Sequence, residues 1–151
     1  MAALPLFFRE LYLEIRTVSL TLFKIMIPVI VAVKLLEVLG GVELLGQLLG
    51  PLMALIGLPE SMGLVWAATM ASNIYAGMVV FFTQPQQEAL TVAQVTVLAG
   101  LMLMAHGLPI EARIAQKAGV RLGATLLLRI GGGFLFAAML HLVYGQGGWL
   151  Q

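Results

Sequence analysis

The chain contains no cysteine and no aspartate, and it has few charged residues of either sign. The lack of cysteine excludes disulfides, thiolate catalysis and cysteine-ligated metal sites. Only 10% of the 151 residues are charged and the formal net charge is +1, so the basic surface needed to bind nucleic acid is missing. We therefore expect no nucleic-acid partner, no metal and no other cofactor.

Apolar residues, in contrast, are in large excess. They make up 61% of the chain, and the mean hydropathy is +1.04. Soluble domains are about 45–50% apolar and about 25% charged, and a short chain cannot hide so much apolar surface from water. The composition predicts an integral membrane protein, with the lipid bilayer as its first partner and the inner (cytoplasmic) membrane as its location.

The apolar runs predict an all-α, multi-pass protein with about five crossing or re-entrant helices. Residues 1–16 have apolar side chains at helical spacing, which is typical of an amphipathic helix in the membrane interface. An early, charged start to the first span explains the same pattern equally well. Residues 17–151 are expected to form one membrane-embedded domain. An amphipathic piece is predicted at 110–121, and the spans are predicted at 17–39, 42–58, 61–82, 92–106 and 122–144.

Basic residues give the expected orientation. They gather before the first span and again after the fourth, at Arg113, Lys117 and Arg121. Lys and Arg are enriched in cytoplasmic loops, so both groups face the cytoplasm if four crossings separate them. This predicts five crossings with the N-terminus inside and the C-terminus outside. Segment 42–58 is short and Gly-rich, and a re-entrant course for it stays open.

A Gly-Leu-Pro tripeptide occurs twice, at residues 57–59 and 107–109. The segments that end in it align as 42–60 and 92–110, and they share six pairs: Val42/Val92, Leu48/Leu98, Gly50/Gly100, Gly57/Gly107, Leu58/Leu108 and Pro59/Pro109. Each copy is expected to end a helix at Gly and to start another with Pro near its first position. Transporters often contain helices that are interrupted at corresponding positions of two repeats. We therefore predict helix breaks at Gly57 and Pro59, and at Gly107 and Pro109.

The second copy is surrounded by polar residues. His106 precedes it, Glu111 follows it, and Arg129 lies inside the last predicted span. A charged side chain at membrane depth costs about 2.5–3.5 kcal/mol on insertion scales, so such residues are normally paired or face water. We predict that the three form a polar cluster that binds a solute. The alternative is that Glu111 and Arg129 are separate interfacial residues that reach toward headgroups.

Asn73 is a fourth candidate for solute binding. It lies in the middle of the predicted span 61–82, where an amide cannot comfortably face lipid. Asn73 could hydrogen-bond a solute, or it could join two helices, which is the commoner use of such residues.

Two rows of small residues predict close helix packing. Gly63, Ala67 and Ala71 recur at steps of four, and so do Ala115, Gly119 and Gly123. Such rows allow helices to approach closely, within one chain or between copies. From them we predict self-association into a homo-oligomer.

The segments "LLGPLMALIGLPES" and "HGLPIEARIAQKAG", together with Arg129, resemble the nucleoside recognition (Gate) domain. This domain occurs in concentrative nucleoside transporters, in ferrous-iron transport protein B and in spore maturation proteins A and B. The resemblance covers roughly residues 20–145. It implies an all-helical module in a permeation path, with His106, Pro109, Glu111, Gly119 and Arg129 as motif positions. The chain is much shorter than a nucleoside transporter and lacks a GTP-binding domain, so neither specificity is carried over.

The leading expectation is a small transport or gating protein that forms a path for a small polar solute or ion. One copy has too few helices to enclose such a path, so we expect a homo-oligomer or a second membrane subunit. The alternative is a non-transporting scaffold that binds a partner protein. An enzyme acting on lipids is a weaker option, because the sequence contains no recognisable catalytic set.

Overall fold

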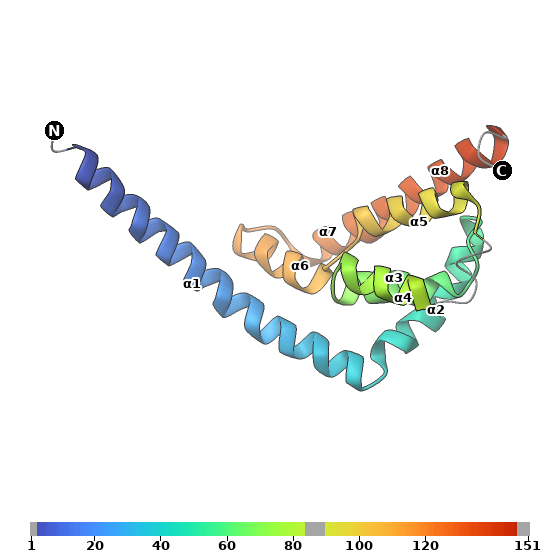
Figure 1. Cartoon of the computed structure of the whole chain (residues 1–151), viewed down its shortest axis with the longest axis horizontal. Coiled ribbons are helices and arrows are strands. Elements are labelled where there is room, and N and C mark those ends of the chain that lie inside the picture. The colour runs from blue at the N-terminus through green and yellow to red at the C-terminus, as the bar shows by residue number, and fades with distance from the viewer. Residues whose placement is uncertain (1–2, 84–89, 148–151) are drawn as a thin grey trace.

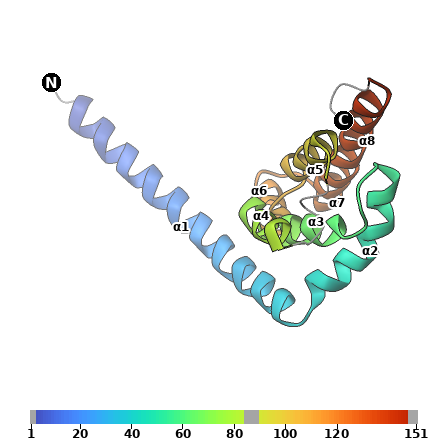
Figure 2. The same cartoon turned by 45° about the vertical axis from the view of Figure 1, so that its right-hand side comes forward.

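The computed structural model describes residues 3–83 and 90–147, and within these ranges the ordered elements are helices with no strand. This confirms the all-α prediction. Figures 1 and 2 show one long helix leaning away from a bundle formed by the others. The elements are α1 (Ala3–Val38), α2 (Gly41–Leu55), α3 (Met62–Ala71), α4 (Ile74–Thr83), α5 (Val92–Met104), α6 (Leu108–Lys117), α7 (Leu122–Leu126), the π-helical turn η2 (Leu127–Gly131) and α8 (Gly132–Gly147). Residues 84–89, between the predicted spans 61–82 and 92–106, lie outside the described residues.

The first helix is a single element. Residues 1–16 were expected to form a helix of their own, but α1 runs without a break through position 16 and on past Pro28. No glycine or proline lies between Pro5 and Pro28, so nothing in the sequence ends a helix there. The alternative of an early start to the first long helix therefore describes the structure. The main contacts of α1 with the rest of the chain are with α2 and α6.

The predicted span 61–82 is not one helix, and this prediction is wrong. The chain breaks between Ala71 and Ile74 and folds back on itself, so that α3 and α4 form a hairpin. The side chain of Thr69 lies directly against Gly77, and Val80 packs on the buried alanines of α3. In a continuous helix Thr69 and Gly77 would be about 12 Å apart along the axis.

Helix α3 forms the centre of the bundle. It is apolar on all sides, which is typical of a buried helix, and it contacts α2, α4, α5 and α6. The largest side chain in its core is Trp66, which is fully buried. The buried residues of α3 are Met62, Gly63, and Val65 to Ala71.

The two Gly-Leu-Pro segments both lie where the chain leaves a helix. Gly57 and Gly107 have φ values of 72° and 53°, in the left-handed region that glycine adopts without strain. After α2, the N–H of Leu58 donates to the carbonyl of Met53 at 3.0 Å and closes the helix end. Pro109 lies in the first turn of α6, where its missing N–H costs nothing.

The first small-residue row packs within the chain. A methyl group at Gly63 would lie 2.6 Å from the carbonyl oxygen of Gly46 and 2.7 Å from the nitrogen of Gly50, so α2 and α3 touch through their backbones. Ala67 and Ala71 are buried. This row is therefore not available to a second copy of the chain. The prediction that it mediates self-association is wrong for this row.

The second row does not form one helical face. Helix α6 ends at Lys117, and Gly119 follows it with a φ of 89°. The N–H of Val120 donates to the carbonyl of Ala115 at 3.0 Å, which is the hydrogen bond of a glycine-closed helix end. Gly123 lies beyond this turn, in α7, and nothing is packed against it. Gly119 thus ends helix α6 and does not lie at a contact between two helices.

Two described stretches are long and apolar enough to cross a membrane, Leu122–Tyr144 and Val92–Lys117. The first matches the last predicted span, and the second contains the break between α5 and α6. Helices α2, α3 and α4 are apolar but shorter. Because 61–82 folds back on itself, the count of five crossings loses one of its members. The predicted orientation required four crossings before Arg113, so it does not follow once 61–82 is a hairpin.

Candidate functional site

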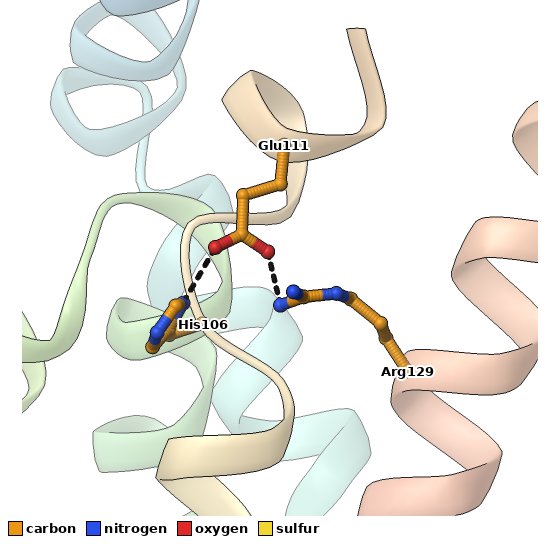
Figure 3. Close-up of polar contacts among 3 residues, drawn as sticks. All are labelled: His106, Glu111 and Arg129. Carbon is orange, nitrogen blue, oxygen red and sulfur yellow. Dashed lines mark ion pairs between the residues drawn. The ribbon is translucent and has the colours of Figure 1, made fainter. Parts of the chain in front are cut away.

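Three of the predicted site residues lie together where α5 gives way to α6 (Figure 3). His106 belongs to the link between the two helices, and Glu111 lies in the first turn of α6. Arg129 comes from η2, a separate element on the other side of the cluster. The fold therefore brings together residues that the sequence had grouped by chemistry alone.

Glu111 joins the other two side chains. Its Oε1 lies 3.0 Å from Nδ1 of His106, and its Oε2 forms an ion pair with the Arg129 guanidinium. The three side chains are each 29–34% exposed. A carboxylate only accepts hydrogen bonds, so Nδ1 of His106 is the donor in a hydrogen bond at this contact. Glu111 and Arg129 balance each other's charge.

The α3–α4 hairpin contacts the α5–α6 link beside the cluster. The N–H of Gly107 donates to the carbonyl of Thr69 at 3.0 Å, which ties the α5–α6 link to the C-terminal end of α3. Gly107 also lies against the carbonyl of Ser72, which a methyl group there would approach to 3.5 Å. Four helix ends meet at this point, those of α3, α4, α5 and α6. Glu111 sits at the N-terminal end of α6, where the helix dipole favours a negative charge.

Arg129 occupies a π-helical turn inside a longer helix. Residues Leu127–Gly131 form this turn, with α7 before it and α8 after it. The helix starts at Leu122, so Arg129 lies within it and not at its first residue. Single π turns within α-helices are frequent at functional sites.

Asn73 does not join this cluster. It lies at the tip of the α3–α4 hairpin, where its Oδ1 accepts a hydrogen bond from the N–H of Ala76 at 3.0 Å and so caps α4. Its Nδ2 lies 3.3 Å from Oγ of Ser72. The prediction that Asn73 lies in the middle of a span is wrong, because the helix is interrupted at this residue. The capping role is local, and a role in binding a solute stays a prediction.

The first Gly-Leu-Pro segment has polar neighbours that sequence reasoning missed. The carbonyl of Gly57 accepts a hydrogen bond from Nε2 of Gln94 at 2.8 Å. The imidazole of His141, in α8, occupies the space that a side chain at Gly57 would need. Pro59 follows in the link to α3. Thr91 three residues before Gln94 is a capping-box pattern and does cap α5, but no sequence signal connects either Gln94 or His141 to Gly57.

The chain is similar to a protein of known sequence. No protein-family model and no solved structure matches the chain. The chain is 32% identical over 127 residues to a protein of Bacillus subtilis (strain 168) named uncharacterized membrane protein YvoD, a match that covers 84% of the chain and 39% of that protein. The chain thus spans well under half of its relative. This similarity agrees with the composition and supports a helical membrane protein, and it names no family.

Proposed function

We propose that the chain is a small membrane transport or gating protein that acts as a homo-oligomer and provides a path for a small polar solute or an ion. The observation that carries the proposal is the cluster of His106, Glu111 and Arg129 at a point where four helix ends meet. The proposal assigns no catalytic residue and no cofactor.

The chemistry of the cluster suits a wetted site. Glu111 and Arg129 are paired, yet about a third of each side chain remains exposed in the single chain. A buried charge is tolerated in a membrane where it is paired and lines a cavity. A polar solute that reached the cluster could exchange hydrogen bonds with Glu111, with Arg129 or with Nε2 of His106.

The hairpin of α3 and α4 suits the same role. Each of its helices has 10 residues, which corresponds to about 15 Å, or half of a hydrocarbon core about 30 Å thick. Short helices that meet near the midplane supply dipole ends and free backbone groups to the sites of many transporters. In the proposed arrangement the hairpin enters and leaves on one face of the membrane, and the carbonyl of Thr69, near its tip, accepts the hydrogen bond of Gly107 beside the cluster.

The resemblance to the nucleoside recognition (Gate) family is part of the proposal. It supports a place for His106, Pro109, Glu111, Gly119 and Arg129 in or beside a permeation path of a multi-pass inner-membrane protein. The identity of the solute is not inferred from the family name.

Flux measurements in proteoliposomes test the proposal. The purified chain is reconstituted, proton entry is followed with an entrapped pH-sensitive dye, and uptake is measured with radiolabelled uridine and by stopped-flow swelling in urea. We expect the wild type to conduct at least one of these and Glu111→Gln to conduct much less. Glu60→Gln is the matched control, because Glu60 follows the first Gly-Leu-Pro segment and is exposed. It should retain the flux of the wild type.

Two results would count against transport. Flux no greater than that of empty liposomes for every solute, or equal flux in wild type and Glu111→Gln, would reject the proposed path. In the first case, capture of one membrane or soluble protein in stoichiometric amounts by the wild type would favour the scaffold alternative.

A further inference from the structure

Helix α1 is too long to be contained in a bilayer. It has 36 residues, which gives it a length of about 54 Å against a hydrocarbon core of about 30 Å. Since the helix is unbroken, its N-terminal part cannot lie flat in the interface while the rest crosses. If the apolar part from residue 17 onward spans the membrane, residues 3–16 extend about 20 Å beyond the hydrocarbon.

The described side chains of this N-terminal extension are not covered by the rest of the chain. Figures 1 and 2 both show it pointing away from the bundle, and every side chain from Phe7 to Val18 is exposed or nearly so. Several are large and apolar, with exposed fractions of 57% for Phe7, 59% for Phe8 and 57% for Ile15. An uncovered apolar strip of this kind in water usually marks a contact surface.

The apolar residues repeat with the spacing of a coiled coil. They recur at alternating steps of three and four, which keeps one seam on one side of a helix that pairs with another. The described residues of this seam are Phe8, Leu11, Ile15 and Val18. Leu13 lies on the opposite side of the helix.

Charges of opposite sign lie on the two sides of the seam. Arg9 and Arg16, seven residues apart, lie on one flank, and Glu10 and Glu14, four residues apart, lie on the other. Among the ion pairs of the described residues, none involves these four side chains. In a parallel pair of identical helices the acidic flank of each faces the basic flank of the other, whereas in an antiparallel pair like flanks face each other.

We propose that the N-terminal extension of α1 binds the same segment of a second copy of the chain, in parallel, along the Phe8–Val18 seam. Copies inserted in one membrane in the same orientation are related by an axis along the membrane normal, so their first helices are parallel. The charge pattern favours that arrangement. The inference identifies the contact within the proposed oligomer and holds whether or not the chain transports a solute.

Oxidative cross-linking in native membranes tests the contact, and the cysteine-free chain allows single-cysteine variants. Phe8→Cys and Ile15→Cys should each form disulfide-linked dimers with themselves, and Leu13→Cys, on the opposite side, should form few. Cross-linking between Phe8→Cys of one copy and Val18→Cys of another would indicate an antiparallel pair and would overturn the proposal. Equal yields at all three positions, or none at 8 and 15, would also overturn it.

Charge reversal gives a second, independent measurement. Arg9→Glu with Arg16→Glu makes both flanks acidic and should weaken self-association about tenfold. Adding Glu10→Arg and Glu14→Arg restores opposite flanks and should restore the cross-linked fraction. If the first variant cross-links as well as wild type, the charge argument is wrong. Absence of flux with cross-linking intact would reject the proposed function alone.

Discussion

Glu111 in α6 and Arg129 in η2 form an ion pair, although the turn at Gly119 and helix α7 separate the two elements in the sequence. His106 contacts the same carboxylate from the opposite side at 3.0 Å. The pair therefore links the break after α5 to the π-helical turn of the last long helix.

The pair predicts strong energetic coupling. Removing one member of a buried pair strands the other and typically costs about 3–5 kcal/mol, whereas an exposed pair contributes about 0–1 kcal/mol. Glu111→Gln and Arg129→Met should each lower the stability strongly, and the double variant should lose less than the sum. Thermal unfolding in detergent gives the double-mutant cycle. Arg113→Met is the control, because in the described part of the chain Arg113 hydrogen-bonds Gln116 and takes part in no ion pair. Additive losses below about 1 kcal/mol would show two independent side chains.

The hairpin predicts a strong effect at Gly77. A methyl group there would overlap the Thr69 hydroxyl and lie 2.9 Å from the end of Met102. Gly77→Ala should destabilise the protein by about 1–3 kcal/mol through overpacking, and Thr69→Ala in the same chain should recover part of the loss. Gly132→Ala, where nothing is within 4 Å, should be tolerated. A neutral Gly77→Ala would mean that α3 and α4 do not pack as described.

Gly119 is predicted to act through its backbone. Its φ of 89° is unfavourable for other residues, and Gly119→Ala should cost about 1–2 kcal/mol. Gly123→Ala, in an uncrowded helical position, should be neutral or stabilising by up to about 1 kcal/mol. Neither change should alter the oligomeric state seen by light scattering. Dissociation of the oligomer by Gly119→Ala, without loss of stability, would restore the packing role that the second small-residue row suggested.

The hairpin also makes a prediction about topology. Glu60 and Thr83 are exposed and flank the α3–α4 hairpin. A re-entrant hairpin places both on one face of the membrane, so a membrane-impermeant thiol reagent should label Glu60→Cys and Thr83→Cys from the same side. Labelling from opposite sides would mean that this segment crosses the membrane, as the sequence alone suggested.

Part of this structure could be predicted from the sequence. The last long helix was found because one apolar run, 122–144, is long enough to be unambiguous, and the cluster was found because rare charges in an apolar chain must pair. The hairpin was missed because its turn, at Ser72 and Asn73, contains neither glycine nor proline. That turn depends on the Asn73 cap and on packing against Gly77, which are visible only in three dimensions. Small-residue spacing likewise indicates close packing but not the partner.

The claim that the cluster is a wetted site at membrane depth is tested most directly by spin labels at positions 106 and 128 in bilayers. Leu128, next to Arg129, is 75% exposed on the helix surface. We expect a label at His106→Cys to collide readily with a water-soluble paramagnetic agent. A label at Leu128→Cys should instead collide with oxygen dissolved in lipid. Two water-like labels would place the cluster outside the bilayer, and two lipid-like labels would show that it is dry. Either result would contradict a polar path at this site.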